Sequence, residues 1–300
     1  SRKTNRAMVG TTVFITGGSR GIGLAIALEC AKNGCNVAIA AKTADPHPTL
    51  QGTIFTAAEE IEKAGGFALP IVCDIRFEDQ VQAAVEKCVR TFGGLDILVN
   101  NASAIWPRPT LDTPMKKYDL MNTVNTRGTY MTSRICLPHL IASAKRKPGK
   151  QHILTISPPL NMNKEWFSAH VAYTIAKYGM SMCCLGMSEE FKGHGIGVNC
   201  LWPRTGIATA AVEWLGGQEM LDTCRKVEIM SEAAVAIIKR DSRYCTGNFF
   251  LDDNVLREEG VADFDKYAVK PGTPLLRDFF LDDEEDPNLI NSKLQKRIPL

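Results

Sequence analysis

The sequence predicts an α/β fold in which a doubly wound parallel sheet carries helices on both faces. Short apolar runs alternate with longer segments of helical period from residue 11 to residue 251. These runs lack the apolar–polar alternation of a strand that has one solvent-exposed face. The chain has 300 residues, 45% hydrophobic and 23% charged, which is enough to bury a substantial core in one large domain or two small ones.

The expected strands are continuous apolar runs, which suits strands that are covered on both faces of a parallel sheet. The first of them leads directly into a glycine-rich turn. In chain order the expected strands are residues 11–15, 36–41, 68–75, 95–100, 153–157, 197–201 and 247–251.

The expected helices carry apolar residues at helical spacing. Residues 80–91 illustrate this, because Val81, Ala84, Val85 and Cys88 fall on one face of a helix. In chain order the expected helices are residues 22–32, 53–64, 80–91, 120–143, 172–191 and 232–239. Residues 282–300 are rich in acids, Asn, Pro and Lys, so we expect one domain over 1–281 and a tail or linker over 282–300.

Charge and cysteine usage narrow the class of protein. The net charge is +2, and the short basic cluster at residues 145–147 precedes Pro148 and Gly149, which indicates a solvated loop and no nucleic-acid partner. The ten cysteines show neither Cys-x-x-Cys nor zinc spacing. We therefore expect reduced thiols, an intracellular protein and no bound metal.

The sequence gives little indication of a membrane span, a secretory signal or a peroxisomal signal. No apolar run approaches the roughly 20 residues of a membrane span, and the basic N-terminal residues are not followed by the apolar stretch of a secretory signal. Ser292-Lys293-Leu294 resembles a peroxisomal address, but such an address is read at the extreme C-terminus. The sequence therefore predicts no membrane span and no secretory signal.

Glycines mark the turn between the first expected strand and the first expected helix. Gly17 suits a tight turn, Gly21 lets the backbone approach a diphosphate, and Gly23 lets the helix pack closely on the sheet. The N-terminus of the following helix then faces the anion. The alternative is a glycine-rich connecting loop without a ligand. The expected cofactor-binding residues are Gly17, Gly18, Ser19, Arg20, Gly21, Ile22 and Gly23.

The end of the second expected strand indicates which nicotinamide cofactor binds. An NAD site carries an acid there for the ribose 2′-OH, whereas an NADP site needs positive charge. Lys42 follows this strand, no acid occurs before Asp45, and Arg20 adds a second cation. These residues favour NADP. The alternative is that Lys42 is a solvated strand-end lysine.

Tyr173 and Lys177 are four residues apart on an expected helix, so they share one face of it. A nearby cation favours the phenolate and brings the tyrosine closer to exchanging protons near neutral pH. The alternative for such an isolated pair is a half-buried tyrosine beside a solvated lysine.

Three motifs occur in order: the spacing Gly17, Gly21, Gly23, the segment Asn100-Asn101-Ala102-Ser103, and Tyr173 with Lys177. Together they resemble the short-chain dehydrogenase/reductase superfamily, which implies a Rossmann-type fold. The resemblance implies a tyrosine that exchanges a proton while its lysine holds the nicotinamide ribose, and dimers or tetramers formed through the long helices. Further roles fall to Asn101 beside the cofactor, Asn125 in a proton relay, Asp74 at the adenine and Thr209 at the carboxamide.

Some of these positions have other interpretations, and one departs from the pattern. Asp74 could instead cap a helix, and Asn125 could satisfy a helix backbone. The superfamily's carbonyl-polarising serine aligns better with Pro158 than with Ser157. Either a rearranged loop brings Ser157 into the site or no serine acts there. The nearby polar residues that could substitute are Asn161, Asn163 and Ser168.

Several stretches, among them residues 40–48, 156–161, 173–181 and 267–282, resemble the hydroxysteroid dehydrogenase-like group of this superfamily. The group's full-length members add a C-terminal sterol-carrier domain and are associated with peroxisomes and mitochondria. That resemblance implies a lipid-like substrate and a chain that matches only the dehydrogenase portion. A pocket lid is expected between Gly206 and Lys226, where Trp214 indicates either an apolar substrate or simple helix packing.

Two functions follow from these patterns. The first is an NADP-dependent oxidoreductase that interconverts a hydroxyl and a carbonyl on a small, lipid-like molecule, with Tyr173 as general acid or base and Lys177, Asn125 and Ser157 in support. The second is an NADP(H)-binding scaffold with little turnover, which Pro158 favours.

Overall fold

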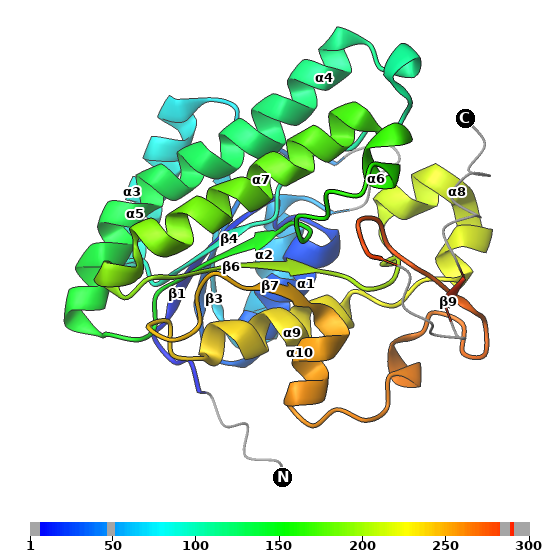
Figure 1. The fold of residues 1–300 in the computed structure, drawn as a ribbon. Helices are drawn as coiled ribbons and strands as arrows, with labels where there is room; N and C mark the ends of the chain where they lie inside the picture. Colours follow the sequence, from blue (N-terminus) through cyan, green and yellow to red (C-terminus); the bar gives the residue numbers. More distant parts are fainter. Residues whose placement is uncertain (1–6, 47–51, 283–288, 291–300) are drawn as a thin grey trace.

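Seven strands form one parallel sheet in the computed structural model, which describes residues 7–46, 52–282 and 289–290 (Figure 1). The strand order is β3-β2-β1-β4-β5-β6-β7. The strands are β1 Thr12–Thr16, β2 Asn36–Ala41, β3 Phe67–Val72, β4 Ile97–Asn100, β5 His152–Ile156, β6 Gly197–Trp202 and β7 Phe249–Leu251. The predicted doubly wound parallel sheet is confirmed.

Helices cover both faces of the sheet (Figure 1). One face packs against α1 Gly21–Lys32, α2 Ile54–Lys63, α9 Glu228–Lys239 and α10 Asp252–Glu258. The other face packs against α3 Glu78–Phe92, α5 Gly128–Arg146 and α7 Val171–Glu190. Each layer buries an apolar core, which explains why the inner strands are mostly apolar. Within the described residues no helix is both long enough and apolar enough to span a bilayer.

The third strand ends earlier than the sequence predicts. Residues 68–75 were expected, but β3 spans Phe67–Val72 and lies at the edge of the sheet. Phe67 and Val72 are 70% and 57% exposed, so the apolar run does not mark a fully covered strand here. Pro70 lies within β3, which an edge strand tolerates because one side of it needs no backbone donors.

The long helix predicted over 120–143 is three segments. A first helix, α4 Met115–Met121, leads into a π-helical turn over Asn122–Arg127, and α5 then continues to Arg146. The spacing of apolar residues did not reveal the π turn, because a single turn with one residue more than an α-helical turn leaves that spacing nearly unchanged. π turns often occur at functional sites, and this one contains Asn125.

Several short elements were not predicted. α9 begins at Glu228, earlier than the expected residue 232. The remaining elements are α6 Glu165–Ser168, α8 Ala210–Asp222, β8 Leu275–Leu276 and β9 Leu289–Ile290. α8 bends at Gly217, which has φ of 63°. Much of α8 is exposed, and its glycines obscure helical periodicity.

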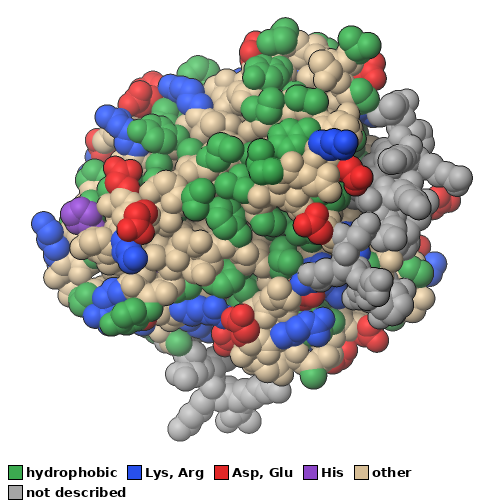
Figure 2. Space-filling view, in the orientation of Figure 1, with side chains coloured by type: hydrophobic (Ala, Val, Ile, Leu, Met, Phe, Trp, Pro, Cys, Tyr) green, Lys and Arg blue, Asp and Glu red, His purple; other side chains and the backbone are tan. Residues whose placement is uncertain are grey.

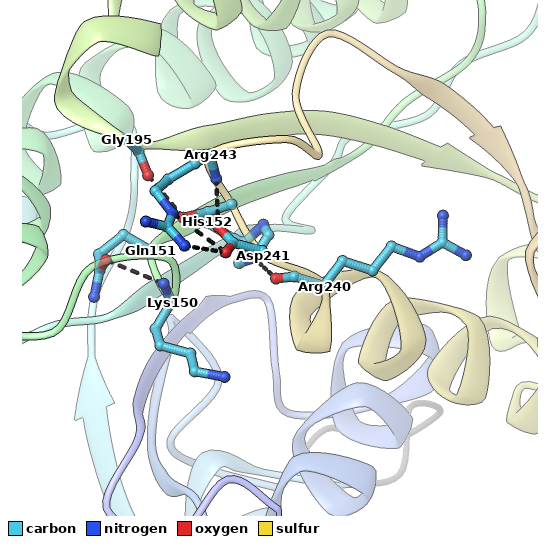
Figure 3. A network of polar contacts seen from close by, with 8 residues as sticks. Lys150, Gln151, His152, Gly195, Arg240, Asp241 and Arg243 are labelled. Atoms are coloured by element: carbon cyan, nitrogen blue, oxygen red, sulfur yellow. Dashed lines mark hydrogen bonds and ion pairs between the residues drawn. The ribbon is translucent and has the colours of Figure 1, made fainter.

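A buried histidine, His152, begins β5 and lies beside Arg240 and Asp241 (Figure 3). His152 is 1% exposed, and its Nε2–H donates to the Arg240 carbonyl at 3.0 Å. Its Nδ1 atom is buried and has no hydrogen-bond partner in the described part of the chain. The neighbouring Asp241 carboxylate is held by Arg243. Burial lowers the pKa of His152 to about 4.

This histidine makes the fold sensitive to acid. Its folded-state pKa lies below the ordinary value, so the unfolded chain binds more protons between about pH 6.5 and about pH 4. The stability that neutral His152 contributes is therefore present above that window and lost as pH falls through it. The wild-type protein's free energy of unfolding minus that of His152→Gln should be about 2 kcal/mol smaller at about pH 5 than at about pH 8, because the wild type loses stability as pH falls. Urea unfolding measures it, and a difference independent of pH would contradict the interpretation.

Candidate active site

The glycine turn connects β1 to α1 at the carboxyl edge of the sheet. Gly17 and Gly21 have φ of 68° and 57°, a region that side-chain-bearing residues rarely adopt. A Cβ on Gly17 would lie 2.9 Å from the Ala102 Cα atom. The N-cap residue of α1, Arg20, makes no side-chain cap, and the first turn holds no acid. The first N–H groups of α1 therefore remain available for an anion.

Asn101 holds the glycine turn against the end of β4. Its side-chain amide donates to the carbonyls of Thr16 at 3.1 Å and Gly17 at 3.0 Å. Gly23 leaves room for this arrangement, because a Cβ there would overlap the Asn101 amide and lie 2.5 Å from the Gly17 oxygen. β1 and β4 are neighbours whose connections run in opposite directions, which is the switch point where such sheets bind ligands.

Three cations lie near the carboxyl ends of β2 and β3. Arg20 donates to the Gly52 carbonyl at 2.8 Å, and its buried Nε atom has no partner among the described residues. Lys42 is exposed just after β2. Arg76, which sequence reasoning missed, holds the Asp74 carboxylate through its Nε atom at 3.0 Å and through a second nitrogen. This pairing, with Lys42 contributing, lowers the pKa of Asp74.

Tyr173 and Lys177 line one cavity of about 230 Å³ at the carboxyl edge of the sheet. The predicted residues Ile22, Asn101 and Thr209 line the same cavity, so the glycine turn and the tyrosine pair meet in one site. Its apolar walls come from the loop after β4, from β6 and from α8. These wall residues are Ile105, Ile156, Trp202, Ile207, Val212, Leu215 and Met220.

Burial governs the charges of the tyrosine pair. Lys177 is 3% exposed, its Nζ donates to the Ile156 carbonyl at 2.8 Å, and it lies 5.1 Å from the Trp202 ring centre. Burial lowers the pKa of Lys177 to about 8. Burial, with a smaller contribution from Asp278, raises the pKa of Tyr173 above its usual range.

Asn125 does not line the cavity but braces its wall. The side chain is fully buried in the π turn. Its Oδ1 accepts from the Ala104 N–H at 2.7 Å, and its Nδ2 donates to the Ala104 carbonyl at 3.0 Å. Both ends of the amide thus fix the loop that carries Ser103 and Ile105 into the cavity.

Ser157 does not line the cavity of Tyr173 and Lys177. It is fully buried, and its hydroxyl is hydrogen-bonded to that of Ser181 and lies 3.8 Å from the Cys200 sulfur. The structure therefore does not bring Ser157 to the site, and the next residue, Pro158, has no hydroxyl.

The C-terminal segment supplies residues that sequence reasoning missed. Leu276, Arg277, Asp278 and Phe279 line the cavity, although they lie far along the chain from Tyr173. The sequence signal that could have found them is the charged pair at residues 277–278 followed by the aromatic pair at residues 279–280, because a solvated loop would not carry two adjacent aromatic side chains. Phe280, which is fully buried against the rings of Tyr173 and Trp202, anchors the segment.

Comparison with known proteins adds independent support. The short chain dehydrogenase profile matches residues 11–216. Hydroxysteroid dehydrogenase-like protein 2 of Bos taurus is 60% identical over 286 residues, 95% of this chain and 66% of that protein. The protein of the same name in Homo sapiens is 59% identical over 288 residues, 96% of this chain and 67% of that protein. Across such curated relatives the chain spans between about half and two thirds of their length.

Solved structures agree with this relationship. A Mycobacterium thermoresistibile short chain dehydrogenase is 50% identical with a TM-score of 0.86, covering 93% of this chain and 98% of that one. A Xanthomonas campestris protein is 52% identical with a TM-score of 0.88, covering 92% and 99%. Because the profile, the relatives and the fold coincide over most of its length, the chain belongs to the short chain dehydrogenase family, whose members are oxidoreductases that use nicotinamide cofactors.

Proposed function

We propose that the chain is an NADP-dependent oxidoreductase that interconverts a hydroxyl and a carbonyl on a lipid-like molecule, with Tyr173 as the proton donor or acceptor. The observation that carries this proposal is one cavity lined by Tyr173, by Lys177 and by Ile22, which follows Gly21 of the glycine turn. The apolar walls of that cavity favour an aliphatic or alicyclic substrate.

The residues at the glycine turn fit a dinucleotide. The open N-terminus of α1 suits the diphosphate, and the unpartnered Nε atom of Arg20 suits an added phosphate nearby. Lys42 and Arg76 add positive charge at the same edge, which favours NADP over NAD. Thr209 would contact the carboxamide, and Asp74, held by Arg76, would lie at the adenine end. Bound NADPH would supply the hydride for carbonyl reduction.

The chain's own residues would then handle the proton. Tyr173 donates its phenolic proton to the carbonyl oxygen as that oxygen gains charge. Lys177, four residues along the same helix, supplies a positive charge that favours the phenolate and orients the ribose. Asn125 acts indirectly, because it fixes the loop at Ala104 that closes one side of the site.

We also propose that the protein forms a homodimer or homotetramer through α5 and α7. Figure 2 shows hydrophobic side chains at the molecular surface where these helices lie. Four large ones are between 42% and 53% exposed, and an apolar patch on two long adjacent helices suits a symmetric partner. They are Tyr130, Ile175, Met182 and Leu185. From the family resemblance we further propose an intracellular location, in peroxisomes or mitochondria.

A substrate panel tests the proposed function. The protein is mixed with NADPH and with ketones, ketoacyl thioesters and enoyl thioesters, and the nicotinamide absorbance is followed. Oxidation of NADPH with at least one carbonyl compound is the expected result. Micromolar NADPH binding without turnover of any compound would favour the alternative, a cofactor-binding scaffold, which the displaced Ser157 and Pro158 support.

The cofactor preference has its own test. Lys42→Ala should weaken NADPH binding about 10-fold or more, because it removes a charge that faces the 2′-phosphate. NADH, which lacks this phosphate, should bind almost unchanged. Fluorescence titration of both cofactors measures the two dissociation constants. Lys63→Ala, at the far end of α2, is the matched control. Equal weakening of NADPH and NADH by Lys42→Ala would remove the argument for NADP.

A further inference from the structure

The C-terminal segment fixes a carboxyl group in the cavity that holds Tyr173 and Lys177. The Asp278 N–H donates to the Arg204 carbonyl at 3.0 Å, and the Trp202 ring nitrogen donates to the Phe279 carbonyl at 3.0 Å. These two hydrogen bonds fix the backbone at Asp278, and Asp278 is one of the residues that line the cavity. Its Oδ1 atom accepts from the Phe279 N–H at 2.7 Å. Among the residues that line this cavity it is the single carboxylic acid.

The serine that the family resemblance places beside the carbonyl is not among the residues that line the cavity. Ser157 is turned toward Ser181 beneath the site, and Pro158 offers no donor. Ser103 lines the cavity, but its hydroxyl already donates to the Ala104 carbonyl at 3.5 Å. Asp278 interacts electrostatically with both Tyr173 and Lys177. It is therefore the side chain best situated to contact an oxygen that also reaches the tyrosine.

We propose that the Asp278 carboxylic acid donates a hydrogen bond to the carbonyl oxygen of the substrate, beside the Tyr173 hydroxyl. This inference rests on the proposed oxidoreductase function. The proton that the oxygen gains comes from Tyr173, and Asp278 keeps its own. Its hydrogen bond strengthens as negative charge develops on the oxygen, so it favours the transition state over the bound ketone.

The surroundings of Asp278 allow it to hold a proton near neutral pH. The groups that interact electrostatically with it are Lys177 and Tyr173 on α7, Asp252 on α10 and Cys224 before α9, and the buried Arg277 lines the same cavity. Burial, reinforced by Asp252 and opposed by Lys177, raises the pKa of Asp278 to about 7. A carboxylic acid that an apolar site keeps neutral can serve as a hydrogen-bond donor. The neighbouring Arg204 guanidinium donates to Asp253 at 2.7 Å.

Infrared spectroscopy of a bound ketone tests the proposal without turnover. The probe is 2-decanone labelled with ¹³C at the carbonyl, bound in the presence of NADP⁺, which cannot donate hydride. At about pH 6 the wild-type protein should lower the carbonyl stretching frequency through Asp278 and Tyr173, and at about pH 9 the shift should shrink to the part that Tyr173 alone produces. Asp278→Ala should show this smaller shift at both values. Asp278→Asn, which keeps the volume and a donor, should retain the larger shift at both.

The matched control is Asp282→Asn, four residues later in the same segment, where the carboxylate accepts from Asn161 outside the cavity. This variant should reproduce the wild-type shift. In the reduction assay Asp278→Ala should lower kcat about 100-fold while NADPH binding, which also reports correct folding, is unchanged.

The outcomes separate the two proposals. Equal carbonyl frequencies in wild type and Asp278→Ala at about pH 6, with ketone bound to both, would overturn the role of Asp278 alone. Wild-type protein that reduces no carbonyl compound and binds no ketone would overturn the proposed function, and the role of Asp278 with it.

Discussion

Replacing Tyr173 with phenylalanine should lower kcat for carbonyl reduction by about 10²- to 10⁴-fold. The substitution removes one oxygen, the atom that would exchange a proton with the substrate, and leaves a ring of the same size in contact with Phe279 and Phe280. The dissociation constant for NADPH should stay within about twofold, since the glycine turn and Lys177 are unchanged. Initial rates with the best carbonyl of the panel, and fluorescence titration of NADPH, measure the two quantities.

The matched control is Tyr178→Phe on the same helix. The Tyr178 hydroxyl donates to the Asn161 carbonyl, and Tyr178 is not among the residues that line the cavity. Its loss should affect stability more than turnover. Full activity of the Tyr173→Phe protein would refute the proposed proton transfer.

Replacing Phe280 with alanine should destabilise the protein by about 3–5 kcal/mol. Its ring is fully buried and lies within about 6 Å of the rings of Trp166, Tyr178 and Trp202. Truncation would leave a void too large for these rigid neighbours to fill. Because Phe280 anchors the segment that carries Asp278 and Phe279 into the cavity, the Michaelis constant should rise as well.

Tyr244→Ala is the control for this substitution, since Tyr244 is 83% exposed. Its free energy of unfolding should stay within about 0.5 kcal/mol of wild type. Urea unfolding of the three proteins gives the comparison. A loss below about 1 kcal/mol for Phe280→Ala would mean that the C-terminal segment is not held as described.

The sheet was predictable because its interior strands obey a simple physical rule. β1, β2, β5 and β6 lie between two layers of helices, so they are buried and mostly apolar, and a nearly continuous apolar run shows this in the sequence. β3 has a neighbour on one side only, so the rule fails there and its predicted end is wrong. The same local logic finds the glycine turn, whose positive φ angles demand glycine.

The cavity was only partly predictable. The glycine turn, Asn101, Tyr173 and Lys177 belong to local patterns, and the structure brings them to one place. Asp278 belongs to no pattern, because its chemistry arises from a long-range return of the chain to β6. Ser157 illustrates the reverse case, since a suitable residue type near the expected position is hydrogen-bonded to Ser181 and does not line the cavity.

Two tryptophans next to residues of the cavity wall form a natural optical probe. Trp214 on α8 and Trp106 in the loop after β4 lie 6.1 Å apart, centre to centre, beside the wall residues Leu215 and Ile105. Two indoles this close exchange excitation energy, and the emission of the pair depends on their separation and on water. Any molecule that passes between them, or any swing of α8 about Gly217, must therefore alter the intrinsic fluorescence. Entry of a ligand can be timed in this protein without attaching a dye.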